Sequence, residues 1–520
     1  MSAPSMPRLD ERGARAALAG LAAAAVGLAV PELAAGLVPG LPSLVAAGGS
    51  LVIALQPAGA KDLVVGLFGT ADKAVLEAAV VVVALLVGAM TGLAARRDIG
   101  RGVVVIVAFG LVAFGGAWQA EVVPAPAAAL SALLGVAAAL VTLRALLPRR
   151  RRAATTGADP AVMPDWGRRR FLLTSGATLA GATAAGVLGR RLLVARGPGT
   201  GAVAATLPRP AEPVPALTAD QSLPAPGLSP IVVPADRFYR IDTALLVPQV
   251  DAATWRLAVD GLVAHRLEFS YADLLAMPLI EQYVTIACVS NPVGGQLVGN
   301  AKWTGIRLKA LLAEAGVQPG ASQVVGRSVD GFTVGFPTAW ALDPSREPLV
   351  ALGMDDAPLP PEHGFPARLI VPGLYGYVSA TKWLAEIELT TLESFDAYWV
   401  RLGWAKQGPI LTQSRIDHPR DGEHVPLGPT WIDGVAWAPD RGVRAVEVRV
   451  DGGAWQAASL SRAISRATWV QWMLQWQPTP GRHAIEVRAT DGTGTIQTDQ
   501  VTPPPPDGAR GHHTISVQAG

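Results

Sequence analysis

The first 195 residues contain long apolar runs that are unusual in a water-soluble fold. Glu32 is the only charged residue between positions 17 and 60. Four further runs are nearly as free of charge, at 74–95, 102–120, 122–147 and 171–189. Because a transmembrane helix needs about 20 consecutive apolar residues, each run approaches the length of a membrane span. The whole chain is 50% hydrophobic and only 16% charged, which also favours a membrane protein.

Three arginine clusters orient these spans, because basic loops stay on the cytoplasmic side of a membrane. The clusters lie at 8–15, 96–101 and 149–152, and they place the N-terminus and two later loops inside. Segment 39–73 must then start and end outside, so we interpret it as amphipathic, interfacial or re-entrant rather than as a crossing. The sequence predicts a multi-pass protein of the cell membrane with five transmembrane helices, at about 17–38, 74–95, 102–120, 124–147 and 171–194.

The fifth predicted span follows a pair of arginines in WGRRRFLL. Arg168 and Arg169 are followed by Phe171 and Leu172, an arrangement that resembles a twin-arginine export signal. Arginines beside any span can also act as a simple topology anchor. Twin-arginine export moves proteins that are already folded, often with a cofactor inserted. The export interpretation therefore predicts a cofactor enzyme on the extracytoplasmic side of the cell membrane.

The chain lacks the sequence features that would hold a haem. All seven histidines lie at or after His265, so the membrane region has no imidazole for a b-type haem. No HPGG haem segment like that of cytochrome b5 and no CxxCH attachment motif occurs. Glu32, Glu77 and Glu121 fall near the predicted outer ends of spans, where acids are either solvated or mark a proton or quinone path. We expect no haem in this chain.

The composition changes beyond the last apolar run. Residues 196–230 are rich in Pro, Ala and Gly and have no apolar periodicity, which predicts a semi-extended linker. Twelve of the 14 tryptophans lie after residue 250, as expected for water-soluble domains with a core. Between 231 and 397, short β-patterned runs alternate with two brief helical patterns. Ser270, with an acid three residues later, has the pattern of a helix-capping residue.

From residue 398 to 520 the pattern is all-β. Alternating apolar and polar residues are divided by DGG, DGTG and PTPG turns, and about seven short strands of this kind are typical of an immunoglobulin-like sandwich. We expect this module to be a scaffold or a dimerising surface. The predicted fold class is multidomain: an α-helical membrane region (1–195), a linker (196–230), an α+β domain (231–397) and an all-β sandwich (398–520).

Cys288 is the only cysteine among the 520 residues. It lies in YVTIACVSNPVGG, where an apolar β-like run meets a turn rich in Pro and Gly. A single thiol cannot form an intrachain disulfide, so Cys288 is either a small buried hydrophobic residue or a reactive thiolate or ligand of a soft metal. The residue taken alone favours the first role, and the neighbouring motifs decide between them.

Several short motifs occur in a characteristic order after residue 231. They are ADRFYRID, WRLAVDG, ACVSNPVGG, AKWTGIRLKALL, APLPPEHGFPARLIVPGLYG and ATKWLAEIEL. In this order and spacing the chain resembles the sulfite oxidase family of molybdopterin enzymes over about residues 231–520, and its tail is similar to that family's dimerisation domain. The membrane portion resembles an extension found in some actinobacterial relatives. The resemblance implies a molybdenum-molybdopterin cofactor whose metal is bound by the Cys288 thiolate, a soft ligand.

The resemblance also assigns side chains to the pterin and its phosphate. A phosphate site needs cations, hydrogen-bond donors and close backbone approach. The residues implied to contact the cofactor are Asp236, Tyr239, Arg240, Ser328, His363, Arg368, Thr381 and Lys382.

The substrate pocket implied by the resemblance keeps some family residues and loses others. Arg240, predicted to be catalytic together with Cys288, would direct positive charge toward a substrate oxygen, and Trp303 would line the pocket. Sulfite-oxidising members usually have an arginine where this chain has Val293 and a tyrosine where it has Phe332. Because each charge-assisted hydrogen bond contributes about 1.5 to 3 kcal/mol, the pocket should bind a dianion such as sulfite less well.

The sequence as a whole predicts a membrane-anchored molybdenum oxidoreductase that transfers an oxygen atom to or from a small molecule. A sulfoxide-type reductase of the same fold is one alternative, and a non-catalytic surface-binding protein on a degenerate sulfite oxidase fold is another. The expected partners are the substrate, membrane lipid, an unidentified electron-transfer partner that is a cytochrome or a quinone, and a second copy in a homodimer. No nucleic acid partner is expected.

Overall fold

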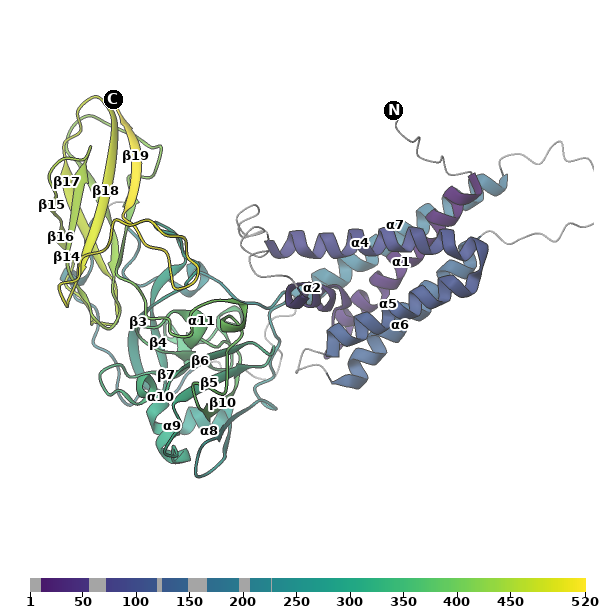
Figure 1. Ribbon diagram of the computed structural model, residues 1–520, viewed down its shortest axis with the longest axis horizontal. Coiled ribbons are helices and arrows are strands. Elements are labelled where there is room, and N and C mark those ends of the chain that lie inside the picture. The colour runs from purple at the N-terminus through teal and green to yellow at the C-terminus, as the bar shows by residue number, and fades with distance from the viewer. Residues whose placement is uncertain (1–10, 56–71, 119–123, 148–165, 196–205, 226) are drawn as a thin grey trace, which may run out of the picture. The chain divides into compact units, whose positions relative to one another are not determined.

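The structure is a computed structural model that describes residues 11–55, 72–118, 124–147, 166–195, 206–225 and 227–520. It divides into two compact units (Figure 1). The first comprises residues 1–197 with 244–246, and the second comprises 198–243 with 247–520.

The first unit is a bundle of apolar helices. Five of its helices are long and apolar enough to cross a membrane, whereas α2, with 12 residues, is too short to do so. Segment 39–73 therefore contributes a short helix, and its residues 56–71 lie outside the described part of the chain. The helices are α1 (Glu11–Leu37), α2 (Leu44–Leu55), α4 (Asp72–Arg97), α5 (Ile99–Trp118), α6 (Ala125–Leu146) and α7 (Trp166–Ala195).

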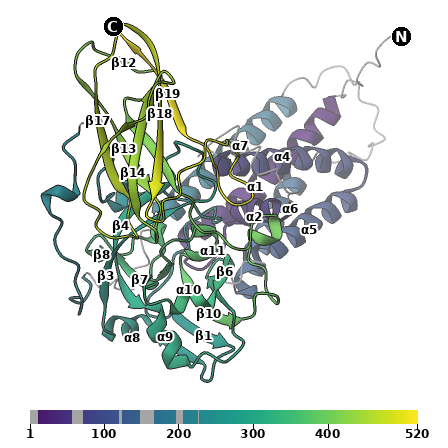
Figure 2. The ribbon, with the colours of Figure 1, turned by 60° about the vertical axis from the view of Figure 1, so that its left-hand side comes forward.

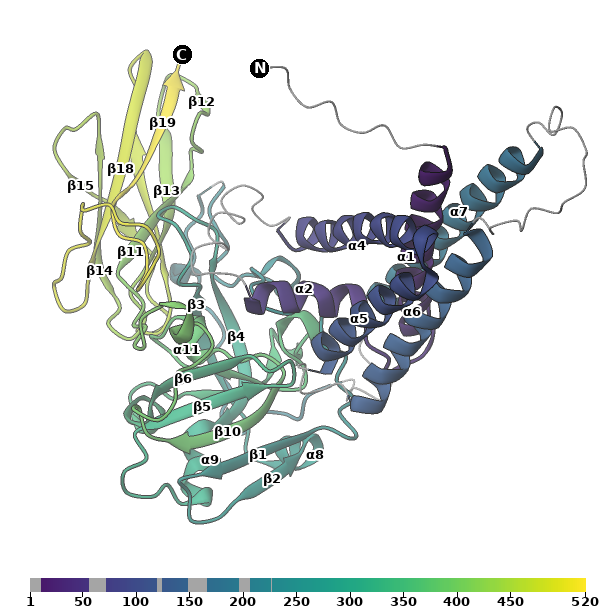
Figure 3. The ribbon, with the colours of Figure 1, turned by 45° about the vertical axis from the view of Figure 1, so that its right-hand side comes forward.

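Small residues allow α1 to pack closely against α4, α6 and α7 (Figure 3). A Cβ added at Gly92 would lie 1.9 Å from the Ala16 carbonyl oxygen, and one added at Gly189 would lie 2.5 Å from the Glu32 carbonyl oxygen. Apolar side chains gain little from leaving lipid for a helix interface, so close backbone approach through glycine and alanine stabilises membrane bundles. The sequence pattern of this unit therefore suits helix packing in lipid.

Two of the three acids noted in the membrane region meet one arginine. Ser43 Oγ donates to Glu32 Oε2 at 2.7 Å, and Arg190 Nη1 lies 3.6 Å from Glu32 Oε1. Arg190 also forms an ion pair with Glu77. This cluster joins α1, α4 and α7, and pairing of this kind reduces the cost of charge in an apolar bundle. Glu121 lies outside the described residues.

The second unit begins with an α+β part containing two sheets. One sheet has the order β2-β1-β10-β5-β6, and the other has the order β3-β4-β7-β8 with β9 paired to β7. The strands are β1 (Arg256–Gly261), β2 (Leu267–Ser270), β3 (Ile280–Ala287), β4 (Val298–Arg307), β5 (Gln323–Ser328), β6 (Thr333–Pro337), β7 (Leu349–Met354), β8 (Ala357–Pro358), β9 (Arg368–Ile370) and β10 (Leu384–Thr390). The helices are α8 (Tyr271–Ala276), α9 (Leu308–Ala315), α10 (Thr338–Leu342) and α11 (Gly376–Ser379).

Local sequence explains where these short helices begin and end. Ser270 caps α8, because its hydroxyl accepts from the Asp273 amide while the Asp273 carboxylate accepts from the Ser270 amide. The capping predicted for Ser270 is thus present. Helix α9 ends at Gly316, whose φ of 69° is left-handed and favours glycine.

The rest of the second unit contains two further sheets that enclose a core of their own. Their orders are β11-β13-β17-β16 and β12-β19-β18-β14-β15. Side chains from both sheets, such as Ile432, Trp472 and Val487, form one buried cluster, so this part is a β-sandwich. Its strands are β11 (Gln413–His418), β12 (His424–Val425), β13 (Thr430–Trp437), β14 (Val443–Val450), β15 (Gln456–Ala457), β16 (Ser459–Leu460), β17 (Val470–Trp476), β18 (Gly481–Asp491) and β19 (His513–Ala519).

The sandwich lies against the α+β part (Figure 2), and side chains of strand β13 belong to the cores of both parts. Ile432 and Ala436 point into the sandwich. Val435 and Trp437 instead belong to the core of the α+β part, because side chains alternate between the two faces of a strand. Both faces of this sheet are therefore buried.

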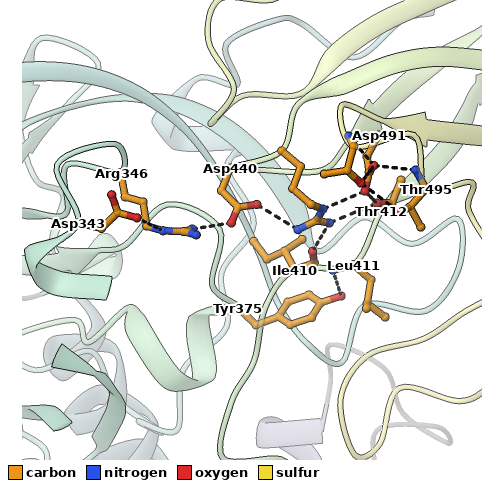
Figure 4. Close-up of polar contacts among 11 residues, drawn as sticks. Asp343, Arg346, Tyr375, Ile410, Leu411, Thr412, Asp440, Asp491 and Thr495 are labelled. Atoms are coloured by element: carbon orange, nitrogen blue, oxygen red, sulfur yellow. Dashed lines mark hydrogen bonds and ion pairs between the residues drawn. The ribbon is translucent and has the colours of Figure 1, made fainter. Parts of the chain in front are cut away.

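A chain of ion pairs also joins the two parts (Figure 4). Arg346, from the α+β part, pairs with Asp343 at 2.8 Å and with Asp440 of the sandwich. Arg441 then bonds Asp440 at 3.0 Å and Asp491 at 2.9 Å. These contacts and the shared core make the second unit one body.

The described part of the predicted linker runs along the second unit. Residues 206–225 and 227–230 contain one 3-10 turn, Ala219–Gln221, and are otherwise irregular. The Ala211 amide donates to the Leu279 carbonyl at 2.8 Å, and the Glu281 amide donates to the Glu212 carbonyl at 3.0 Å. Backbone pairing at the start of β3 thus holds this segment on the domain, which composition alone does not indicate.

Candidate active site

Cys288 lies at the end of two paired strands. Strands β3 and β4 pair up to Ala287 and Val298, and the Cys288 amide donates to the Leu297 carbonyl at 2.9 Å. The half-buried thiol lies 2.9 Å from the Ser290 hydroxyl. Residues 288–297, which we call the cysteine loop, therefore leave and re-enter the sheet at adjacent positions.

An aromatic cluster occupies the same region of the sheet. Trp303 is fully buried on β4, and its indole N–H donates to the Val284 carbonyl at 3.3 Å. Phe238 contacts Trp303 edge-on at 6.0 Å between ring centroids and stacks on Tyr239 at 5.1 Å. The pKa of Tyr239 is raised far above its ordinary value, chiefly by burial and further by the nearby Cys288. Tyr239 thus connects the aromatic cluster to the thiol.

Arg368 is a buried cation with an unused donor. Its guanidinium lies 5.0 Å from the centre of the Trp303 ring, and its Nη1 donates to the His363 carbonyl at 3.1 Å. Burial lowers its pKa to about 10. Among the described residues, no hydrogen-bond partner reaches its buried Nε. A buried donor of this kind is costly unless a ligand supplies an acceptor.

Lys382 is a second buried cation, and Asp242 links it to Arg240. Lys382 Nζ lies 3.1 Å from Asp242 Oδ2 and donates to the Glu362 carbonyl at 2.9 Å. Arg240 Nε lies 3.0 Å from the same Asp242 oxygen. Burial lowers the pKa of Lys382 to about 8, although Asp242 opposes the shift. Sequence reasoning missed Asp242, which could have been found because residues two apart on an extended segment share a face.

His363 packs beside these cations as a neutral side chain. Its Nε2 lies 2.7 Å from the Ala235 carbonyl oxygen, and burial lowers its pKa to about 4. The next residue, Gly364, has a φ of 110°, and a Cβ there would lie 2.9 Å from the Lys382 backbone. Glycine at this position therefore allows His363 and Lys382 to come close.

The remaining predicted residues lie at varying distances from this group. Thr381 is buried, and its hydroxyl donates to the Gly326 carbonyl at 3.4 Å. Ser328 accepts from the Asp330 amide at 3.4 Å, and the pKa of Asp330 is raised by burial with a smaller contribution from Asp242. The β5–β6 turn that carries Ser328 therefore lies near the cations.

Within the described residues, the side chains of three predicted residues make no hydrogen bond or ring contact with Cys288, Trp303 or the buried cations. Asp236 is exposed in a 3-10 turn. Val293 is half-buried in the cysteine loop, and Phe332 packs on Tyr398 at 5.7 Å between ring centroids. Within the described residues, no group of three or more His, Cys, Asp or Glu side chains could hold a metal. A metal bound by Cys288 would need ligands from a cofactor.

Comparison with known proteins finds relatives of the second unit. Residues 244–399 match the family model described as "Oxidoreductase molybdopterin binding domain". Human mitochondrial sulfite oxidase is 32% identical over 307 residues, which cover 50% of this chain and 56% of the human protein. "Uncharacterized oxidoreductase YuiH" of Bacillus subtilis (strain 168) is 35% identical over 166 residues, covering 32% of this chain and 80% of YuiH.

A solved structure, that of the sulfane dehydrogenase SoxCD from Paracoccus pantotrophus, overlaps 51% of this chain and 74% of its own. Its TM-score is 0.45 and its sequence identity 23%. The chain spans little more than half the length of the human sulfite oxidase it matches. The matched family segment includes Cys288, His363, Arg368 and Lys382, whereas Arg240 lies upstream of it.

Proposed function

Because the chain belongs to the sulfite oxidase family of molybdopterin-dependent oxidoreductases, we propose that it is an enzyme that transfers an oxygen atom to or from a small molecule. The observation that carries this proposal is the placement of a thiol, Cys288, and a buried cation, Arg368, around the same residue, Tyr239, with a second buried cation, Lys382, close to Arg368. A thiolate suits a soft, redox-active metal, and buried cations need an anion.

The residues of the site fit an anionic organic cofactor. The buried Nε of Arg368 has no acceptor among the described residues, and burial lowers the pKa of Lys382 to about 8 even though Asp242 offsets part of this shift. A phosphate or the polar edge of a pterin would supply acceptors to both cations. The left-handed backbone at Gly364 leaves no room for a side chain where the cofactor-binding segment turns.

Different side chains would bind different parts of this cofactor. Cys288 would bind molybdenum, and the cofactor would supply the redox chemistry of oxygen transfer when it is bound. Arg368, held over Trp303, and neutral His363 would contact the pterin. The residues proposed to contact the cofactor are Asp236, Tyr239, Arg240, Ser328, His363, Arg368, Thr381 and Lys382.

The pocket favours a substrate with less negative charge than sulfite. Val293 offers no cation and Phe332 no hydroxyl, and Asp242 already pairs with Arg240 at 3.0 Å. An arginine beside a carboxylate attracts a second anion less strongly. This observation supports a second candidate function, the reduction of a neutral oxide such as a sulfoxide. Turnover with artificial electron donors and with artificial acceptors distinguishes the two directions.

The proposed setting is the cell membrane, with residues 198–520 on the extracytoplasmic side. Five apolar helices and the arginine pair in the first turn of α7 support this arrangement. Electrons would pass to or from a cytochrome or a quinone, because the chain has no haem-binding motif. The sandwich would be immunoglobulin-like and would form the homodimer, and the domain boundaries are those of the sequence analysis.

Metal analysis tests the proposal against a non-catalytic binding protein. The full chain is purified from a host that makes the molybdenum cofactor, and molybdenum and pterin are measured per chain. We expect stoichiometric amounts of both. Protein that folds normally but carries neither would refute the enzyme proposal.

A further inference from the structure

The cysteine loop is fixed at its base and contacts the β-sandwich at its tip. Its base is fixed by the sheet, where the Cys288 amide donates to the Leu297 carbonyl at 2.9 Å. Inside the loop, the Leu297 amide donates to Asn291 Oδ1 at 2.8 Å, and the Gly295 amide donates to the Pro292 carbonyl at 2.9 Å. Its tip, which carries Val293, lies against the β-sandwich.

Arg415 of the sandwich forms a hydrogen bond to this tip. It lies on β11, is only 2% exposed, and uses each nitrogen of its guanidinium. Nη1 donates to the Gly295 carbonyl at 3.0 Å, Nη2 donates to Ser229 Oγ at 2.9 Å, and Nε donates to Asp417 Oδ1 at 2.6 Å. A planar guanidinium bonded on three sides cannot turn without breaking a bond, so the Gly295 carbonyl is held in one place.

His513 closes the other side of the tip. Its Nδ1 accepts from the Ile416 amide at 3.0 Å, which fixes the ring on strand β19. The ring touches Gly294, where a Cβ would lie 2.2 Å from His513 Nε2. With a φ of 76°, Gly294 also has a left-handed backbone that favours glycine. The tip is thus enclosed by two side chains that are both provided by the sandwich.

We propose that Arg415 and His513 are positioning residues of the active site, and that the sandwich sets the position of the Cys288 thiolate and of Val293. The predicted effect on a metal rests on the proposed function, whereas the contacts that hold the loop do not. Partners that orient a metal ligand commonly change metal affinity or activity by 10- to 100-fold when they are removed. The sandwich is then a structural part of the catalytic unit as well as a scaffold.

Two Arg415 variants and one matched control test this inference in the full chain. Arg415→Ala removes the three side-chain hydrogen bonds of Arg415. Arg415→Lys keeps the positive charge but loses the planar group that donates in three directions. Arg346→Ala is the control, because it breaks a different ion pair between the same two parts of the unit (Figure 4), and no hydrogen bond or ion pair of the described residues joins Arg346 to the cysteine loop. Any effect of general loosening between the parts should appear in the control as well.

The first readout is hydrogen exchange of the loop amides in protein from a host without the molybdenum cofactor. We expect the amides of Cys288, Gly295 and Leu297 to exchange at least about tenfold faster in Arg415→Ala, less so in Arg415→Lys, and at the wild-type rate in Arg346→Ala. Unchanged exchange in the Arg415 variants, or equal acceleration in the control, would overturn the inference. This readout does not depend on the proposed function.

The second readout is the electron paramagnetic resonance spectrum of the reduced metal, with kcat and KM, in cofactor-loaded protein. We expect Arg415→Ala to shift the spectrum and lower kcat by about 10- to 100-fold, with Arg415→Lys between it and the wild type. A wild-type spectrum and kcat in molybdenum-loaded Arg415→Ala would refute the link to the metal. Wild-type protein without molybdenum would refute the proposed function instead. If Arg415→Ala fails to accumulate, Arg415→Lys and Ser229→Ala are judged by the same criteria.

Discussion

Replacing Asp242 with Asn should destabilise the second unit by an amount that depends on pH. Asp242 is 4% exposed, lies 3.1 Å from Lys382 Nζ and 3.0 Å from Arg240 Nε, and is the acid between these two cations. An amide keeps the shape of the carboxylate but removes its charge. Removing one partner of a buried ion pair costs about 3 to 5 kcal/mol when the other partner stays charged.

Lys382 can avoid part of this cost by losing its proton. Its pKa is already lowered to about 8, so neutralising it at pH 7 costs about 1.4 kcal/mol. Weakened hydrogen bonds add about 1 kcal/mol, and Arg240, which is 40% exposed, can be hydrated instead. We therefore expect Asp242→Asn to lower the free energy of unfolding by about 2 to 3 kcal/mol at pH 7.

The sign of the pH dependence follows from the lowered pKa of Lys382. The unfolded chain binds this proton more tightly than the folded chain, so stability rises with pH as folded Lys382 deprotonates. Without Asp242, that deprotonation begins at lower pH. The difference between wild type and variant should thus be largest near pH 6 and small near pH 9, where folded Lys382 is neutral in both proteins.

Tryptophan fluorescence on heating measures this difference, because 12 of the 14 tryptophans lie after residue 250. For a unit of this size we expect Tm to fall by roughly 5 °C at pH 6 to 7 in cofactor-free protein. The matched control is Asp396→Asn, which removes an exposed ion pair with Lys406 and should change stability by less than about 1 kcal/mol. Equal shifts in both variants, or no loss at pH 6, would refute the reasoning.

Three further changes test other parts of the molecule. Burial, and then Asp417, raise the pKa of Asp433 to about 8, so native stability should fall as pH rises from about 4 to 8; Asp433→Asn should therefore raise Tm more at pH 8.5 than at pH 5, and a pH-independent gain would contradict this. Changing Arg168 and Arg169 to Lys should leave the second unit inside the cell, and normal protease access from outside would identify the arginines as topology anchors only. Combining Val293→Arg with Phe332→Tyr should lower KM for sulfite by at least about tenfold, and an unchanged KM would place these residues outside the pocket.

Local patterns in the sequence account for the features that depend on neighbouring residues. Apolar runs predict the long helices because crossing a bilayer needs only length and apolarity. The capping pattern at Ser270 predicts the start of α8 because its hydrogen bonds span three residues. Family motifs likewise identify Cys288, Trp303, His363, Arg368 and Lys382 as candidate site residues from the sequence.

Contacts between residues far apart in the sequence could not be predicted in this way. Arg415 lies 120 residues from Gly295, whose carbonyl it holds, and its sequence surroundings look like an ordinary strand. Asp242 becomes significant only once Lys382, 140 residues later, is placed beside it. One long-range feature did leave a signal: apolar residues on both faces of β13 indicate a sheet buried on two sides, although the sequence does not say by what.

The most direct test of the central claim is X-ray absorption at the molybdenum edge, compared between wild-type protein and Cys288→Ser. The spectrum counts the sulfur atoms bound to the metal. If the Cys288 thiolate is a ligand, the wild type should show one sulfur ligand more than the variant, while both contain the pterin. An identical sulfur shell in the two proteins would contradict the assignment of Cys288 to the metal.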